Sequence, residues 1–167
     1  MTPIRISSKA RQRGTTAVEF AIVGLVSFTI LFGAIEVSRL LFTANMLEEA
    51  TRRGARMAVV CEVDDPAIQQ ATVFNLTGGN DSPLFSGLTT ANVSVQYLDE
   101  NGGPIAGYAG DTAEYYRIRY VRVAIDNYTY DIIVPVYETS FVTNEYATVL
   151  PIESLGIHKG GERSTCV

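Results

Sequence analysis

The sequence predicts an α+β fold in which one long N-terminal helix packs against a small antiparallel β-sheet. Three observations support this prediction. From Ala17 to Ile35 the chain has 19 residues whose only charge is that of Glu19. A helical repeat of small and apolar residues then continues to about Val60. Beyond Ala91, apolar and polar residues alternate, which is typical of β-strands.

Charge divides the 167-residue chain into a basic leader and an acidic remainder. Residues 1–14 hold four basic side chains and no acid, whereas the rest holds 9 basic and 18 acidic side chains, a net charge of −9. An acidic domain is a poor candidate for binding nucleic acid, which requires clustered basic charge. Basic residues before an apolar segment stay on the cytoplasmic side, so everything after about residue 40 is expected across the membrane.

The apolar segment 17–35 is long enough to cross a bilayer. At 1.5 Å per residue its 19 residues span roughly 28 Å, close to the hydrocarbon thickness of a membrane. One alternative is a buried helix of a soluble protein, but a helix apolar on all faces is hard to bury in so small a domain. Another is a cleaved secretory signal peptide, but the segment is long for that role and no Ala-x-Ala site follows it.

The helix continues beyond the apolar segment as an amphipathic one, and we expect it to run from about Thr15 to Val60. Its predicted inner face is formed by Leu40, Ala44, Leu47, Ala50, Gly54 and Ala58, with Leu41 and Met57 alongside. The other face predicts two i,i+4 ion pairs, Glu48–Arg52 and Glu49–Arg53. Asp64-Asp65-Pro66 then supplies a cap and a first-turn proline, which predicts a short helix over 66–76.

Strands are predicted over 93–97, 115–126, 128–136 and 144–150, giving an antiparallel sheet of three or four strands. The Asp126-Asn127 turn joins the middle two as a hairpin, and a slip in the alternation near Tyr120 indicates a bulge. Pro135 favours an edge position for its strand. All nine tyrosines lie at or beyond Tyr97, and core packing is the preferred role for them over an adhesive surface.

The sharpest motif is Gly14-Thr15-Thr-Ala-Val-Glu19-Phe20, which lies between the basic leader and the apolar helix. It resembles the class III signal of prepilins. That resemblance implies cleavage by a prepilin peptidase after Gly14, so that Thr15 becomes the first residue and Glu19 the fifth. It also implies that Glu19 pairs with the Thr15 amine of a neighbouring subunit. The alternative is that Glu19 lies at the headgroup boundary and reaches water by itself.

Further motifs extend the resemblance over residues 13–60. They are Arg13 to Ala21, then Phe32-Gly33 with Glu36 and Arg39, then Ala50 with Arg52, Gly54, Ala55, Arg56 and Ala58. This pattern resembles the TadE-like proteins of tight-adherence (Tad, type IVc) pilus systems. The proline common in the family's early span is absent, because the run here is Val23-Gly24-Leu25.

The resemblance implies a pilin-like minor pilin or pseudopilin that initiates or caps a Tad pilus used for surface adherence. Its expected partners are other major and minor pilins and pseudopilins, the prepilin peptidase and the inner-membrane assembly platform. The expected location is the bacterial inner membrane with a periplasmic domain, or incorporation into the extracellular pilus. Residues 1–14 would be the leader, 15–38 the transmembrane half of the helix and 39–167 the periplasmic domain.

Glu19, Phe20, Glu36 and Arg39 are the residues expected to serve subunit assembly. Glu36 and Arg39 are i,i+3 neighbours near the far membrane boundary. Two interpretations stay open for them. They form an intrahelical pair that lowers the cost of charge near lipid, or they pair with adjacent subunits.

Two cysteines, Cys61 and Cys166, lie at the end of the long helix and at the next-to-last position. A disulfide between them would close a loop of about 105 residues and contribute about 4 to 5 kcal/mol in the chain-entropy model. Two free or intermolecular thiols are the alternative.

Catalysis has little support in the sequence. His158 is the only histidine, and no nucleophile–base set or metal-ligand spacing accompanies it. We therefore expect no enzymatic activity, no cofactor and no metal. The alternative function is that of an uncleaved single-pass membrane protein whose outer domain binds a ligand or envelope partner.

Overall fold

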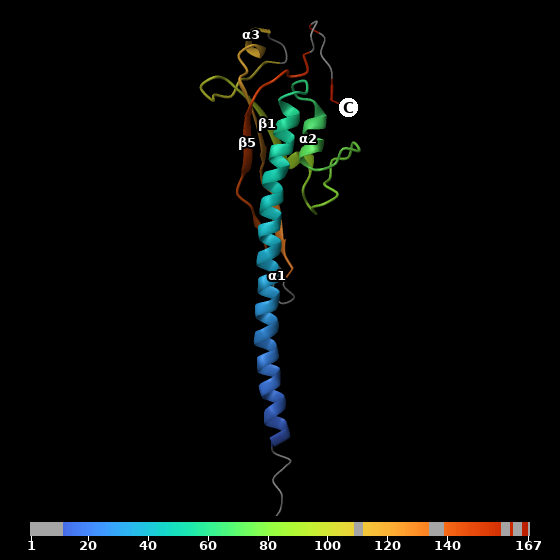
Figure 1. Ribbon diagram of the computed structural model, residues 1–167, viewed down its shortest axis with the longest axis vertical. Helices are drawn as coiled ribbons and strands as arrows, with labels where there is room; N and C mark the ends of the chain where they lie inside the picture. Colours follow the sequence, from blue (N-terminus) through green and yellow to red (C-terminus); the bar gives the residue numbers. More distant parts are fainter. Residues whose placement is uncertain (1–11, 109–111, 134–138, 158–160, 162–164, 167) are drawn as a thin grey trace, which may run out of the picture.

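The computed structural model describes residues 12–108, 112–133, 139–157, 161, 165 and 166. A long helical stem carries a small α+β head at its C-terminal end (Figure 1). The stem is α1, Gln12–Ala58, whose 47 residues span about 70 Å. The structure confirms the predicted fold class, with a long N-terminal apolar helix packed against small antiparallel sheets. His158 and Pro135 lie outside the described residues.

The second half of α1 buries one stripe of small side chains against the head. Leu47, Ala50, Gly54 and Ala58 are buried as predicted, and Leu40 and Ala44 are half-buried. Leu41 is 58% exposed, so its placement beside this face was wrong. Further buried positions on the stripe are Thr43, Thr51 and Ala55. The stripe therefore includes polar residues, which a search for apolar periodicity does not find.

Buried threonines are tolerated on this stripe because each has a hydrogen-bond partner. The Thr43 hydroxyl donates to the Arg39 carbonyl at 3.0 Å. The Thr51 hydroxyl lies 2.9 Å from that of Thr148 on the facing strand. On the outer face only one predicted ion pair is present among the described residues, Glu48–Arg52 at 3.5 Å. Arg53 lies instead over the ring of Phe74.

Three antiparallel strands form the main sheet of the head. They are β1 (Val93–Leu98), β2 (Tyr120–Ile125) and β5 (Tyr146–Pro151), in the order β1-β2-β5. The sheet packs on α1, and the core between them includes Leu47, Ile68, Tyr97, Val121 and Val123. A 3₁₀ turn, η1 (Thr90–Asn92), precedes β1, and a single helical turn, α3 (Thr112–Tyr115), lies at the outer end of the head (Figure 1).

A short helix, α2 (Pro66–Thr72), packs beside the last turns of α1 and is shorter than the predicted range 66–76. Its start follows the predicted signals. The Asp65 carboxylate accepts a hydrogen bond from the Ala67 amide at 2.9 Å, and Pro66 occupies the first turn.

The predicted strand 115–126 and its hairpin with 128–136 require correction. The chain leaves α3 at Tyr115, and β2 begins only at Tyr120, so the slip near Tyr120 marks a strand start and not a bulge. From there β2 pairs residue for residue with β1. Both edges of β2 are occupied, by β1 and β5, so the segment after the Asp126-Asn127 turn cannot join it there.

That segment forms a separate two-stranded sheet instead. It contains β3 (Thr129–Ile132) and β4 (Thr139–Val142), and β4 was not predicted. Asn127 has a positive φ of 55°, a conformation that asparagine adopts more readily than most residues and that redirects the chain after β2. Residues 134–136, the end of the predicted strand 128–136, lie outside the described residues.

The C-terminal segment closes over the end of α1. A disulfide joins Cys61 to Cys166 across 105 positions, and the Cys166 amide donates to the Asp65 carboxylate at 2.7 Å. The amides of Leu155 and Gly156 donate to the carbonyls of Val59 and Val60, the two residues that directly follow α1. Backbone groups that a helix terminus leaves unpaired are thereby satisfied.

Two tyrosines hold the turn that follows α1. The Asp64 amide donates to the Tyr97 hydroxyl at 3.0 Å, and the Tyr108 hydroxyl donates to the Asp64 carboxylate at 2.9 Å. The two rings meet edge to face with centroids 4.8 Å apart. Burial raises the pKa of Tyr97, and burial together with the hydrogen bond to Asp64 raises the pKa of Tyr108 to about 12.

The raised pKa of Tyr108 predicts a loss of head stability in strong alkali. An unfolded tyrosine ionises near pH 10, so the stabilisation is fully present below about pH 10. It declines as pH rises through about 12, where the folded-state hydroxyl loses its proton. Urea unfolding of Tyr108→Phe should show a shallower decline of stability over this window than the parent chain. An equally steep decline in both proteins would contradict the assignment.

Gly54 marks the closest approach of α1 to its neighbours, and an alanine there should destabilise the head. A Cβ at this position would collide with the Thr72 hydroxyl and lie 3.1 Å from Val123 Cγ1. Overpacking of this kind costs about 1–3 kcal/mol. Gly33→Ala is the control, because a Cβ at Gly33 would meet nothing within 4 Å. Urea unfolding should show Gly54→Ala losing stability and Gly33→Ala retaining it; equal stabilities would contradict the packing described.

Candidate membrane and assembly site

The first half of α1 exposes large apolar side chains on every face. They are Val18, Phe20, Ile22, Val23, Leu25, Val26, Phe28, Ile30, Leu31, Phe32, Ile35 and Val37. The most apolar stretch of the helix has a mean hydropathy of 2.2, and none of that stretch is buried in the head. By length and composition this helix could cross a membrane. Exposing so large an apolar surface to water is unfavourable, so lipid or other helices suit it better.

The residues predicted for cleavage and assembly lie at the free end of this helix. Gly14 and Thr15 are helical and exposed in its first turns. Phe20 is 79% exposed. Glu19 is also exposed, and within the part of the chain that the structure describes its carboxylate has no ion-pair partner. One helical turn separates Thr15 from Glu19, and both are accessible to a neighbouring molecule. Cleavage at Gly14 and pairing by Glu19 stay predictions.

Glu36 and Arg39 lie at the other end of the apolar segment, where α1 meets the head. The Arg39 guanidinium and the Glu36 carboxylate are 3.0 Å apart, as expected for an intrahelical pair. The Tyr130 hydroxyl, from β3, donates to the same Glu36 oxygen at 2.9 Å. Arg39 also donates to the Asp131 carbonyl. The structure therefore uses both charged residues to attach β3 to the stem.

Tyr130 is held by its ring as well as by its hydroxyl. The guanidinium of Arg39 lies over the ring, 4.6 Å from its centroid, and the ring of Phe141, the cross-strand neighbour on β4, is 5.4 Å away. The residue is 3% exposed. Burial and the hydrogen bond to Glu36 raise the pKa of Tyr130 above its usual value. We call Glu36, Arg39 and Tyr130 the stem clamp.

The sequence predicted core packing for the tyrosines, which holds for Tyr130, but it did not indicate the partner of the Tyr130 hydroxyl. The two residues of this hydrogen bond are 94 positions apart, and no local pattern reports such a separation. Alternation along β3 was the available signal, and it pointed correctly to burial. Four tyrosines, Tyr97, Tyr115, Tyr128 and Tyr130, are buried in the core, whereas Tyr116 is 68% exposed. The intersubunit pairing of Glu36 and Arg39 stays a prediction.

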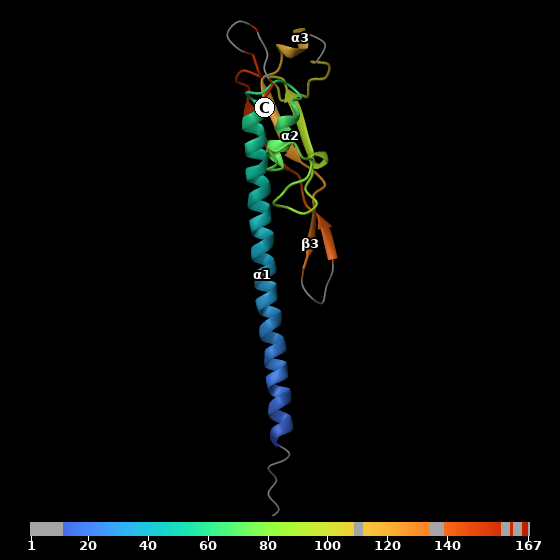
Figure 2. The ribbon, with the colours of Figure 1, turned by 90° about the vertical axis from the view of Figure 1, so that its right-hand side faces the viewer.

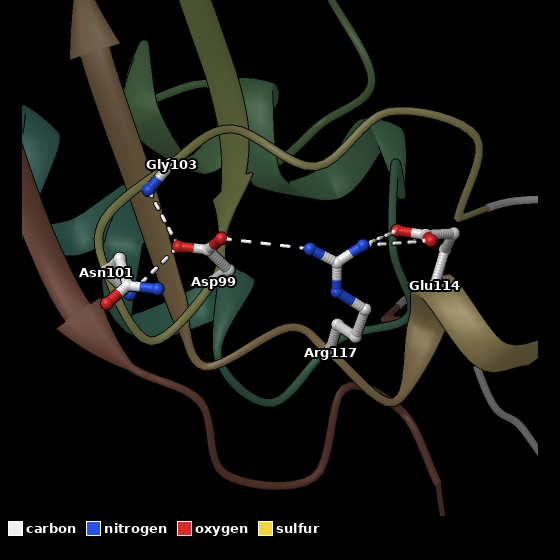
Figure 3. Close-up of polar contacts among 5 residues, drawn as sticks. All are labelled: Asp99, Asn101, Gly103, Glu114 and Arg117. Carbon is white, nitrogen blue, oxygen red and sulfur yellow. Dashed lines mark hydrogen bonds and ion pairs between the residues drawn. The ribbon is translucent and has the colours of Figure 1, made fainter.

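A polar cluster occupies the opposite end of the head (Figure 3). The Asp99 carboxylate accepts hydrogen bonds from the amides of Asn101 and Gly103, both at 2.8 Å. These bonds hold the pKa of Asp99 below its usual value. Arg117 lies between Asp99, at 3.9 Å, and Glu114, at 2.9 Å. The charges satisfy one another, so the cluster braces the turn after β1.

Removing the Tyr130 hydroxyl should loosen β3 and β4 while leaving the main sheet intact. A hydrogen bond to a charged group contributes about 1.5–3 kcal/mol, and Tyr130→Phe removes one with little change in packing. Hydrogen exchange should show faster opening at Thr129–Ile132 and unchanged protection in β1, β2 and β5. Tyr116→Phe is the matched control, because that side chain is exposed. Unchanged protection of β3 in Tyr130→Phe would contradict the stem clamp.

Comparison with known proteins identifies the stem. Residues 14–56 match the model of a family described as TadE-like protein. Neither the curated proteins nor the solved structures contain a significant match to the chain. The matched range starts at Gly14, includes Glu19, Glu36 and Arg39, and ends two residues before the last residue of α1. The chain is therefore similar to TadE-like proteins over its stem, and the match does not extend into the rest of the head.

Proposed function

We propose that this chain is a minor pilin or pseudopilin that works with other pilin-like proteins to initiate or cap a Tad pilus used for surface adherence. One observation carries the proposal. The TadE-like match over 14–56 coincides with a helix whose first half is apolar and free and whose second half is packed into a head. Such a helix can anchor a subunit in lipid and then pack among other helices.

In this proposal the leader 1–14 is removed and residues 15–38 lie in the bacterial inner membrane. Residues 39–167 then face the periplasm, and the protein either stays there or enters the pilus. The positive charge of residues 1–14 and the acidity of the remainder support this orientation. Partners would be other major and minor pilins, the prepilin peptidase and the assembly platform.

The exposed pair of Thr15 and Glu19 supports a specific assembly contact. A carboxylate inside a membrane is costly unless it finds a partner. Cleavage after Gly14 would create a new amine at Thr15, four residues from Glu19. A Glu19 carboxylate could then pair with the Thr15 amine of an adjacent copy or of another pilin, which would set the axial position of one helix beside the next.

The head would contribute by contact, without catalysis and without a cofactor. The shape supports this part of the proposal, because α1, α2 and the strands form one packed body on the stem. The pairing of Arg117 by Asp99 and Glu114 likewise suits a structural role for the outer end.

The mature N-terminus gives the first test. In cells with active prepilin peptidase, mass spectrometry of the purified protein should find a chain that starts at Thr15. A chain that starts at Met1 or Thr2 in such cells would contradict the proposal. It would favour an uncleaved single-pass protein whose outer domain binds a ligand or an envelope partner.

Replacement of Glu19 tests the assembly role separately. Glu19→Ala should leave the head folded and the protein in the membrane, yet fail to restore pili to cells that lack the gene. Glu48→Ala is the matched control, because that glutamate is also exposed on α1 but lies beside the head. It should restore pili, as the parent does. Normal piliation with Glu19→Ala would contradict an essential role for this carboxylate.

A further inference from the structure

We propose that the sheet of β3 and β4 rests on the lipid surface through which α1 leaves the membrane, with Ile133 and Phe141 in contact with lipid. This inference rests on the proposed membrane span of α1. It assigns the second sheet a role as a shallow membrane contact that sets how deeply the stem is inserted.

The sheet of β3 and β4 meets α1 where the apolar segment of the helix ends. Tyr130 and Asp131 contact Glu36 and Arg39, immediately after the apolar segment 17–35 ends. In Figure 2, β3 lies beside α1 on the side of the head that faces the free end of the stem. A membrane that covers the apolar segment therefore ends at the level of this sheet.

The sheet presents exposed apolar side chains at this level. Ile133, next to β3 on its membrane side, is 66% exposed, and Phe141 is 41% exposed. On α1 itself, Ile35 and Val37 are 54% and 58% exposed at the same height. The apolar surface of the stem thus continues onto the sheet. Phe141 also packs on Tyr130, which fixes its position at this level of the stem.

The backbone of the sheet limits how deeply β3 and β4 can enter the bilayer. A two-stranded sheet has open edges, and unpaired backbone groups cannot enter the hydrocarbon region. The outward side chains Asp131 and Ser140 are polar and exposed. The sheet must therefore stay among the headgroups, with only its apolar side chains reaching the upper acyl chains. The stem clamp would hold it at that height.

A bilayer is the occupant that these observations favour over a second protein. The exposed apolar residues of the sheet join a surface that surrounds α1 on every side, as lipid would. A docking site for one partner helix would instead be expected on a single side.

Single tryptophans test the proposal directly, because the chain contains none. The full chain is reconstituted in phosphatidylcholine vesicles containing lipid brominated either near the carbonyl end or near the methyl end of the acyl chain. Four variants are compared: Phe28→Trp in the span, Ile133→Trp and Phe141→Trp on the sheet, and Tyr116→Trp at the outer end of the head. Circular dichroism and an intact disulfide confirm that each variant is folded.

The proposal predicts strong quenching of Ile133→Trp and Phe141→Trp by shallow bromine, weak quenching by deep bromine, and none of Tyr116→Trp by either. Phe28→Trp should be quenched most by deep bromine. If Phe28→Trp is quenched but both sheet variants behave like Tyr116→Trp, the lipid contact is wrong and the membrane span stands. If Phe28→Trp is not quenched either, the proposed membrane span of α1 is wrong as well.

Discussion

The constraint on which the rest of the structure depends is that one uninterrupted helix meets two different environments. From Gln12 to Ala58, α1 keeps a single hydrogen-bonded backbone. Its first half has apolar side chains in all directions, whereas its second half has a narrow stripe of small residues against the head and charges opposite. The apolar first half gives way to the amphipathic second half at Glu36 and Arg39, which carry the first charges after Glu19.

The head is attached to α1 at both ends of that second half. Next to the apolar half of α1, the Tyr130 hydroxyl donates to Glu36 and the Arg39 guanidinium lies over the Tyr130 ring. At the far side, the disulfide between Cys61 and Cys166 and the amides of the C-terminal segment close over the end of the helix. Between these points Gly54 lets α1 approach Thr72 and Val123 closely. Stem and head therefore form one packed unit.

Local sequence patterns predicted which segments form helices and strands better than they predicted which segments pack against one another. Interactions between residues close in sequence predict both helices. The charge-poor segment and the apolar repeat after it predict α1, and the cap at Asp65 and Pro66 predicts α2. Both helices are present. Alternation of apolar and polar residues located β1 and β3 for the same reason. The strand β4 escaped notice because all four of its residues are exposed, so burial imposed no alternation on them.

The pairing of strands and the stem clamp depend on contacts between distant residues. Nothing near Tyr120 indicates that β2 lies between β1 and β5, so the turn at Asn127 looked like an ordinary hairpin. Likewise, Glu36 and Arg39 predict each other through i,i+3 spacing, but Tyr130 lies 94 positions away from Glu36. The motif that resembles TadE-like proteins pointed to the stem, and the family match covers the stem alone.

The central claim is that α1 is divided at Glu36–Arg39 between lipid and head, and hydrogen exchange in increasing urea tests it most directly. The full chain in lipid vesicles should keep its amides protected up to about residue 37, because urea does not remove the bilayer. Amides from about residue 40 to Ala58 should lose protection together with β1, β2 and β5, since the head protects them. Loss of protection along the whole of α1 in one step, or a boundary far from Glu36, would contradict the account.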